Sequence, residues 1–238
     1  MNINFNNFKA RLLPLILLVF ALGFIFYGSG LINSESQAAN SSLPKIETEA
    51  GLAEVIYQRR SEREFSKNPL SKEEIAYLLW AGEGINIDGV SGPTRTSPSA
   101  GATNPLEIYL LAARVDGLEP GIYRYNTADH ELELKREGDK GTELARAALG
   151  QRALEQAPAV LIVAANYERT TARYGERGIR YVQIEAGHAG QNISLMAEEQ
   201  GLGSVIIGAF DDQEILEKLE IESAEPLLLI PVGEKYQE

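Results

Sequence analysis

The chain has 238 residues, of which 44% are hydrophobic and 24% are charged, so it is long enough for one substantial folded domain. Its formal net charge of −12 disfavours a nucleic-acid partner, because proteins that bind polyanions normally present a basic face. The sequence has no cysteine and only two histidines, which excludes disulfides, thiolate metal ligands and a cysteine nucleophile and gives no basis for expecting a metal site.

A long uncharged segment, residues 12–32, lies near the N-terminus and follows Lys9 and Arg11. About 20 apolar residues in a helix cross the hydrocarbon core of a bilayer, which is roughly 30 Å thick. We therefore expect this segment to enter the membrane as a transmembrane or signal helix. The basic residues in front of it predict that the N-terminus stays in the cytoplasm and that the rest of the chain lies outside.

The sequence leaves open whether this segment is removed. Signal peptides usually have shorter apolar regions, which favours an uncleaved membrane anchor. Small residues at Ser36 and Ala38 would permit cleavage after Ala38, followed by secretion. We divide the chain into an anchor or signal segment at residues 1–38, a polar linker at residues 39–50 and one folded domain at residues 51–238.

The folded domain begins with two predicted helices and a long loop. Apolar residues recur at helical spacing within residues 51–60. The second helix is expected at residues 71–82, because Ser71 followed by Glu74 forms a capping box. Residues 82–104 are rich in glycine, serine, threonine and proline and predict a loop, and loops of this length in compact domains usually carry function.

Strands and helices alternate through the remainder of the domain. Almost wholly apolar runs at residues 106–115 and 159–165 are typical of buried strands. We further expect a hairpin at residues 121–125 and 131–136, helices at residues 142–157, 180–200 and 211–219, and strands at residues 204–207 and 226–232. This order predicts an α+β sandwich, in which helices flank a central mixed or antiparallel sheet.

Three arginines and a serine gather in the segment Gln-Arg-Arg-Ser-Glu-Arg-Glu-Phe at residues 58–65. A guanidinium group binds phosphate through two parallel hydrogen bonds, and a serine hydroxyl can add another. The segment therefore predicts an anion receptor formed by Arg59, Arg60, Ser61 and Arg63. The alternative is a solvated run of surface charge, in which the arginines pair with the neighbouring glutamates.

The same segment resembles the opening motif of the nitroreductase-family flavoproteins, Arg-Arg-Ser-x-Arg-x-Phe. Three later blocks, at residues 95–107, 174–210 and 231–235, resemble the SagB/ThcOx-type dehydrogenase branch of that family in order and spacing. The resemblance covers residues 51–235, nearly the whole domain. It implies a nitroreductase-like fold and a homodimer that binds FMN non-covalently at the subunit interface.

The resemblance also implies roles for individual residues. Arg59, Arg60 and Ser61 would hold the FMN phosphate, Arg63 would reach the flavin ring, and Lys235 would reach the phosphate from the C-terminus. The partner subunit would contribute a loop whose small residues let the backbone approach the flavin, and a backbone N–H in a later turn would meet flavin N5. The loop residues are Pro98, Ser99, Ala100 and Gly101, and the turn residues are Ile207 and Gly208.

These features predict an FMN-dependent oxidoreductase that transfers hydride to or from a small organic substrate, with NAD(P)H as a candidate electron donor. No catalytic acid or base can be assigned. Azoline-oxidising members of the branch use a Lys-Tyr pair as base, but here the only such pair is Lys235-Tyr236, whereas Arg173-Tyr174 and Arg180-Tyr181 carry arginine. Arginine stays protonated, which disfavours an azoline peptide as substrate. A non-catalytic module that binds flavin or another phosphate ligand on the same fold is the alternative.

Overall fold

The computed structural model describes residues 51–86, 94–219 and 224–236, all within the compact unit Glu47–Glu238. The predicted membrane segment, residues 12–32, and the polar linker lie outside the described residues. Within the described ranges, no helix combines the length and the apolar character needed to cross a bilayer.

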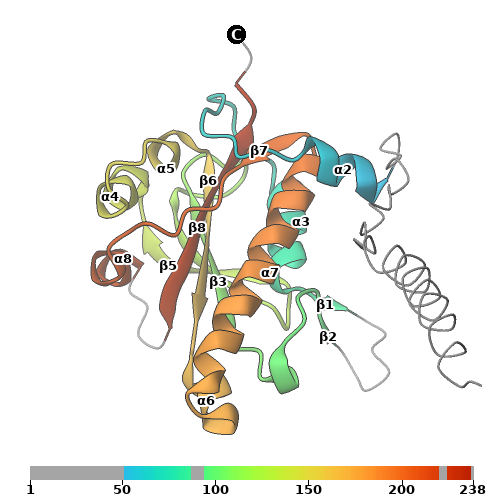
Figure 1. The fold of residues 1–238 in the computed structure, drawn as a ribbon. Coiled ribbons are helices and arrows are strands. Elements are labelled where there is room, and N and C mark those ends of the chain that lie inside the picture. The colour runs from blue at the N-terminus through green and yellow to red at the C-terminus, as the bar shows by residue number, and fades with distance from the viewer. Residues whose placement is uncertain (1–50, 87–93, 220–223, 237–238) are drawn as a thin grey trace, which may run out of the picture. The chain divides into compact units, whose positions relative to one another are not determined.

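Six strands form one sheet in the order β5-β4-β3-β6-β8-β7 (Figure 1). Every neighbouring pair in this sheet is antiparallel, so the expected central sheet is antiparallel and not mixed. The bounds are β3 Leu106–Ala112, β4 Gly121–Asn126, β5 Glu131–Glu137, β6 Ala159–Ala165, β7 Leu202–Ser204 and β8 Glu225–Glu234.

Helices cover both faces of the sheet, as predicted for an α+β sandwich (Figure 1). On one face of the sheet, the helix residues Leu78 and Ile193 pack against Leu161 of β6. On the opposite face, the helix residue Leu144 packs against Ile162 of β6. Successive strand residues point to opposite faces, so β6 is buried on both sides, which explains its uninterrupted apolar sequence. The first layer contains α3 Lys72–Glu83 and α7 Arg177–Glu199, and the second contains α4 Gly141–Ala147, α5 Ala153–Gln156 and α8 Asp212–Leu219.

The capping box at the start of α3 is confirmed. The Glu74 amide donates to Ser71 Oγ at 3.2 Å, and the Ser71 amide donates to Glu74 Oε2 at 2.7 Å. Each side chain therefore satisfies a backbone donor that the first helical turn leaves without an intrahelical acceptor.

We expect Ser71→Ala to lower the free energy of unfolding by about 1 kcal/mol, because the Glu74 amide loses its acceptor. Urea unfolding at pH 7 measures the change. Glu74→Ala removes the other half of the same box, so the double variant should cost less than the sum of the two single changes. Fully additive costs would show that the two hydrogen bonds act independently.

Three local predictions were wrong. The helix expected at residues 142–157 is interrupted between α4 and α5, where Leu149 and Gly150 adopt positive φ values of 57° and 77°. The expected 82–104 loop contains a small antiparallel ribbon, β1 Ile85–Asn86 with β2 Thr94–Arg95, and a 3-10 turn, η1 Ala100–Ala102. The strand expected at residues 204–207 is β7, which ends at Ser204, while Ile207 makes an isolated bridge to Leu229. A further helix, α6 Glu168–Tyr174, was not predicted.

The first predicted helix is α2, Leu52–Gln58, but none of its residues is buried. Leu52 is 65% exposed and Ile56 is 55% exposed, while Val55 is half-buried, so two of the three apolar side chains that define the helical spacing face solvent in the single chain. The pattern therefore predicted the helix without identifying what covers it.

Candidate functional site

The arginine segment leaves α2 and runs alongside the last two strands of the sheet. Arg59 caps the helix with an extended backbone, at φ −51° and ψ 125°. Ser61 then forms a parallel bridge with Ser204 of β7, and the Glu62 amide donates to the Ser204 carbonyl at 2.9 Å. Phe65 bridges Lys235 beyond β8. The backbone of the segment is thus held by the sheet, which gives the arginines a fixed base.

No carboxylate in the described part of the chain forms an ion pair with Arg59, Arg60 or Arg63. The Arg63 guanidinium has one weak intramolecular contact, at 3.5 Å to the Ser61 carbonyl. The pairing with neighbouring glutamates that a mere surface charge run would make is therefore missing. Three guanidiniums that none of the described carboxylates neutralises, next to a serine, have the donor chemistry that a phosphate dianion requires.

One cavity is lined by Arg63 and by Ile207, which are far apart in the sequence. This cavity has a volume of about 330 Å³, and its lining also includes Val205 and Arg152. The Ile207 amide donates to the Leu229 carbonyl at 2.9 Å, so it is occupied within the fold. The next residue, Gly208, is exposed, and a Cβ built on it would meet no atom within 4 Å. A ligand can therefore approach the backbone at Gly208.

Sequence reasoning missed the Gln151 and Arg152 contribution to this cavity. The two residues lie in the segment that was predicted as helix, and the break between α4 and α5 brings them to the cavity wall. Gln151 Nε2 also donates to the Ala209 carbonyl at 3.1 Å, which ties this wall to the turn that contains Gly208. The one local signal for the break was Gly150, because glycine at positive φ commonly ends a helix.

The loop that contains Pro98, Ser99, Ala100 and Gly101 packs elsewhere, against α6 and the first half of α7. The Ala100 amide donates to Glu185 Oε1 at 2.7 Å, and Arg173 Nη1 donates to the Gly101 carbonyl at 2.9 Å. Gly101 has a φ of 61°, and a Cβ there would lie 2.4 Å from the Tyr174 hydroxyl, so this position favours glycine.

One chain therefore does not bring the 98–101 loop to the arginines. The loop contacts Glu185, whereas the arginine segment bridges Ser204, beyond the C-terminal end of α7. From Glu185 to the last residue of α7, the helix rises about 20 Å. In Figure 1, α2 and α6 accordingly lie near opposite ends of α7.

Lys235, the predicted C-terminal phosphate ligand, lies close to the arginine segment but is already paired. Its Nζ is 2.7 Å from Glu198 Oε1, and the Glu198 side chain is largely buried. For Lys235 to reach a phosphate, the phosphate would have to compete with this carboxylate.

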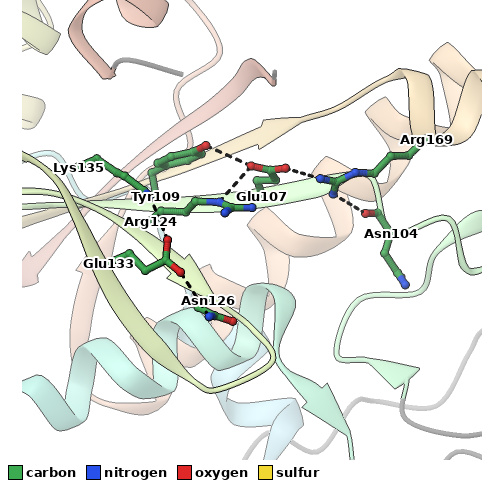
Figure 2. Close-up of polar contacts among 8 residues, drawn as sticks. All are labelled: Asn104, Glu107, Tyr109, Arg124, Asn126, Glu133, Lys135 and Arg169. Carbon is green, nitrogen blue, oxygen red and sulfur yellow. Dashed lines mark hydrogen bonds and ion pairs between the residues drawn. The ribbon is translucent and has the colours of Figure 1, made fainter. Parts of the chain in front are cut away.

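A second buried carboxylate network, which the sequence did not reveal, holds the end of the 98–104 loop. Figure 2 shows the Glu107 carboxylate between the guanidiniums of Arg124 and Arg169 and beside the Tyr109 hydroxyl. Arg169 also donates to the Asn104 carbonyl at 3.2 Å. Burial, reinforced by the Glu107 charge, raises the pKa of Tyr109 to about 12, so this hydroxyl stays protonated at neutral pH. The network therefore fixes the end of the loop.

Comparisons with protein families, with individual proteins and with solved structures all point to one family. The family model described as the nitroreductase family matches residues 56–234. A candidate nitroreductase of Methanocaldococcus jannaschii is 48% identical over 195 residues, which cover 82% of this chain and 96% of that protein. The trifolitoxin operon protein TfxC of Rhizobium leguminosarum bv. trifolii is 27% identical over 191 residues, which cover 75% of this chain and 54% of TfxC. A crystal structure of a candidate nitroreductase from Ralstonia eutropha superposes with a TM-score of 0.67 at 28% identity, covering 82% of this chain and 89% of that one.

Proposed function

Because the chain belongs to the nitroreductase family, whose members generally bind FMN, we propose that it is an FMN-dependent oxidoreductase that transfers hydride to or from a small organic substrate. One observation carries the proposal. Arg59, Arg60 and Arg63 form no ion pair with the described residues, and Arg63 lines a cavity beside a turn with accessible backbone at Gly208.

The residues of this chain fit FMN in three ways. Arg59, Arg60 and Ser61 would bind the phosphate, whose charge they neutralise through forked hydrogen bonds. Arg63 would stabilise negative charge on the ring side of the cavity, and the Gly208 backbone would contact the ring from the other wall. When bound, FMN supplies N5, the ring atom that accepts and donates hydride.

We include in the proposal a homodimer in which the partner subunit supplies the 98–101 loop. Support comes from the separation of that loop from the arginines within one chain. The exposed apolar side chains Leu52, Ile56 and Trp80 on α2 and α3 are a second support, because clustered apolar side chains on a surface mark contact sites.

We further propose that the enzyme belongs to the SagB/ThcOx-type branch and that residues 12–32 tether it to a membrane with the domain outside the cytoplasm. The sequence blocks at residues 95–107 and 174–210 and the similarity to TfxC support the branch. Where the azoline oxidases use a Lys-Tyr pair, this chain offers Arg173-Tyr174 and Arg180-Tyr181, so a small molecule is favoured over an azoline peptide.

The proposal is tested with the purified full-length chain. We expect added FMN to bind and to stay with the protein through gel filtration, where the bound flavin gives an absorbance band at about 450 nm, a general property of oxidised flavins. Anaerobic NADH or NADPH should bleach this band, and a nitroarene or quinone should restore it. The non-catalytic module would be favoured by bound FMN that fails both steps. In that case NAD(P)H does not bleach the flavin, and no such acceptor reoxidises it after chemical reduction. A chain that takes up no FMN would overturn the proposal altogether.

A further inference from the structure

Two carboxylates are buried beneath the 98–101 loop. Glu83, the last residue of α3, is 4% exposed, and Glu185 on α7 is 3% exposed. Glu185 accepts the Ala100 amide at 2.7 Å, and the Ser99 hydroxyl also bonds to it. A carboxylate that accepts a backbone N–H makes a charge-assisted hydrogen bond, which is stronger than one between neutral groups.

Burying two carboxylic acids in this position lowers the stability of the protein when they are charged. Burial raises the pKa of Glu185, an effect that the Ala100 amide, the Ser99 hydroxyl and the charge of His188 oppose. Burial also raises the pKa of Glu83 to about 7, an effect that Arg95 opposes and Glu185 reinforces. Apolar side chains of similar volume would avoid these costs if the two residues only filled space.

Arg95 completes the cluster from β2. Its Nε lies 3.6 Å from Glu83 Oε2, while its Nη1 is buried and has no hydrogen-bond partner in the described part of the chain. Ser97 Oγ donates to the Gly82 carbonyl at 2.7 Å, directly before Glu83 in the sequence. The segment that leads into the loop is therefore tied to α3, and Asn192 Nδ2 of α7 donates to the Thr96 carbonyl at 3.3 Å.

We propose that Glu185 is a positioning residue that sets the conformation of the 98–101 loop for its contact with FMN, supported by the Glu83–Arg95 pair beneath it. This inference rests on the proposed function. Within the loop, Gly101 and Ala102 both have positive φ, at 61° and 54°, and lie exposed on the surface. Arg173 on α6 donates to the Gly101 carbonyl, and the Ala100 amide joins the turn to the buried Glu185 carboxylate on α7.

The loop would contact the flavin ring, whereas the arginines would contact the phosphate, and this difference defines the test. FMN and riboflavin affinities are measured by flavin fluorescence titration on the full-length chain. Glu185→Ala is expected to raise the dissociation constants of both ligands by a similar factor, about tenfold, since one charge-assisted hydrogen bond is lost. Glu185→Gln keeps an oxygen acceptor for Ala100 and should restore both affinities to within about threefold of the original chain.

A second variant tests the same hydrogen bond from the loop side. Ala100→Pro removes the donor N–H at the first position of η1, where the extended backbone of Ser99 is compatible with a following proline. Ala100→Pro should weaken the binding of both flavins as Glu185→Ala does. The double variant should bind them no more weakly than either single variant. Glu176→Ala, which removes an exposed carboxylate next to α7, serves as the control and should leave both affinities unchanged.

The outcomes separate this inference from the proposed function. Full affinity for both flavins in Glu185→Ala and in Ala100→Pro would overturn the positioning role while the proposed function stands. Loss of FMN affinity with riboflavin affinity retained would also overturn it, because the effect would then act at the phosphate. An original chain that binds neither flavin would instead refute the proposed function.

Discussion

Arg59→Ala is expected to weaken FMN binding by a factor of about 10 to 100 and to leave riboflavin binding almost unchanged. Hydrogen bonds to a charged group contribute roughly 1.5–3 kcal/mol, and each 1.4 kcal/mol corresponds to about tenfold in affinity. Arg59 is half-buried at the end of α2 and has no carboxylate partner among the described residues, so its removal creates no new unpaired charge in the protein. The loss should therefore report the contact with the phosphate alone.

Fluorescence titration with the two flavins measures this ratio directly. Arg59→Lys retains the charge but not the planar fork, so its FMN affinity should fall between that of the alanine variant and that of the original chain. Arg146→Ala removes an exposed arginine from α4 and is the matched control for a change of net charge. Equal losses for FMN and riboflavin in Arg59→Ala would place the phosphate elsewhere.

Glu83→Gln is expected to raise the free energy of unfolding at pH 8 by roughly 3 kcal/mol, because that energy corresponds to the rise of the Glu83 pKa from 4.5 to about 7. The pKa of Glu83 is raised from its usual 4.5 to about 7, chiefly by burial. Between these two values the native state binds more protons than the unfolded state, so the stability of the original chain falls as pH rises through this window and levels off above it. Glutamine resembles the protonated acid and removes this contribution to the pH dependence.

Urea unfolding at pH 5 and at pH 8 tests this expectation. The two proteins should differ little at pH 5, and the variant should be the more stable at pH 8. Some pH dependence should remain, because the pKa of Glu185 is raised as well. Glu73→Gln, at an exposed position in the first turn of α3, is the control. A variant that is less stable at pH 8 would mean that the ion pair with Arg95 outweighs the cost of burying the Glu83 charge.

Much of the fold could be predicted because its signals are local. The apolar run of β6 and the Ser71–Glu74 capping box each depend on residues close in the sequence. The break at Leu149 and Gly150 is also local, since Gly150 has a positive φ and its amide donates to the Ala145 carbonyl, but a single glycine inside an alanine-rich run is a weak stop signal. Likewise, helical spacing in α2 predicted a helix but not that its apolar side chains would remain exposed in one chain.

For the candidate site, the sequence suggests a chemistry, whereas its geometry could not be read from local patterns. The residue types at 59–63 indicated an anion receptor, and the structure adds that they lack ion-pair partners among the described residues. Two features depend on long-range packing that no local pattern encodes. One is the proximity of Glu83 and Glu185, and the other is the separation of the 98–101 loop from the arginines.

The bridge between Ser61 and Ser204 has a consequence for solubility. An outermost strand presents unpaired backbone groups on which another chain can add a strand, and such addition leads to aggregation. At β7 the arginine segment occupies this position, while at the other margin of the sheet β5 carries alternating charges, including Glu131, Glu133 and Lys135. Proteolytic removal of the arginine segment would therefore open β7 to self-association between molecules, in addition to removing the proposed phosphate ligands.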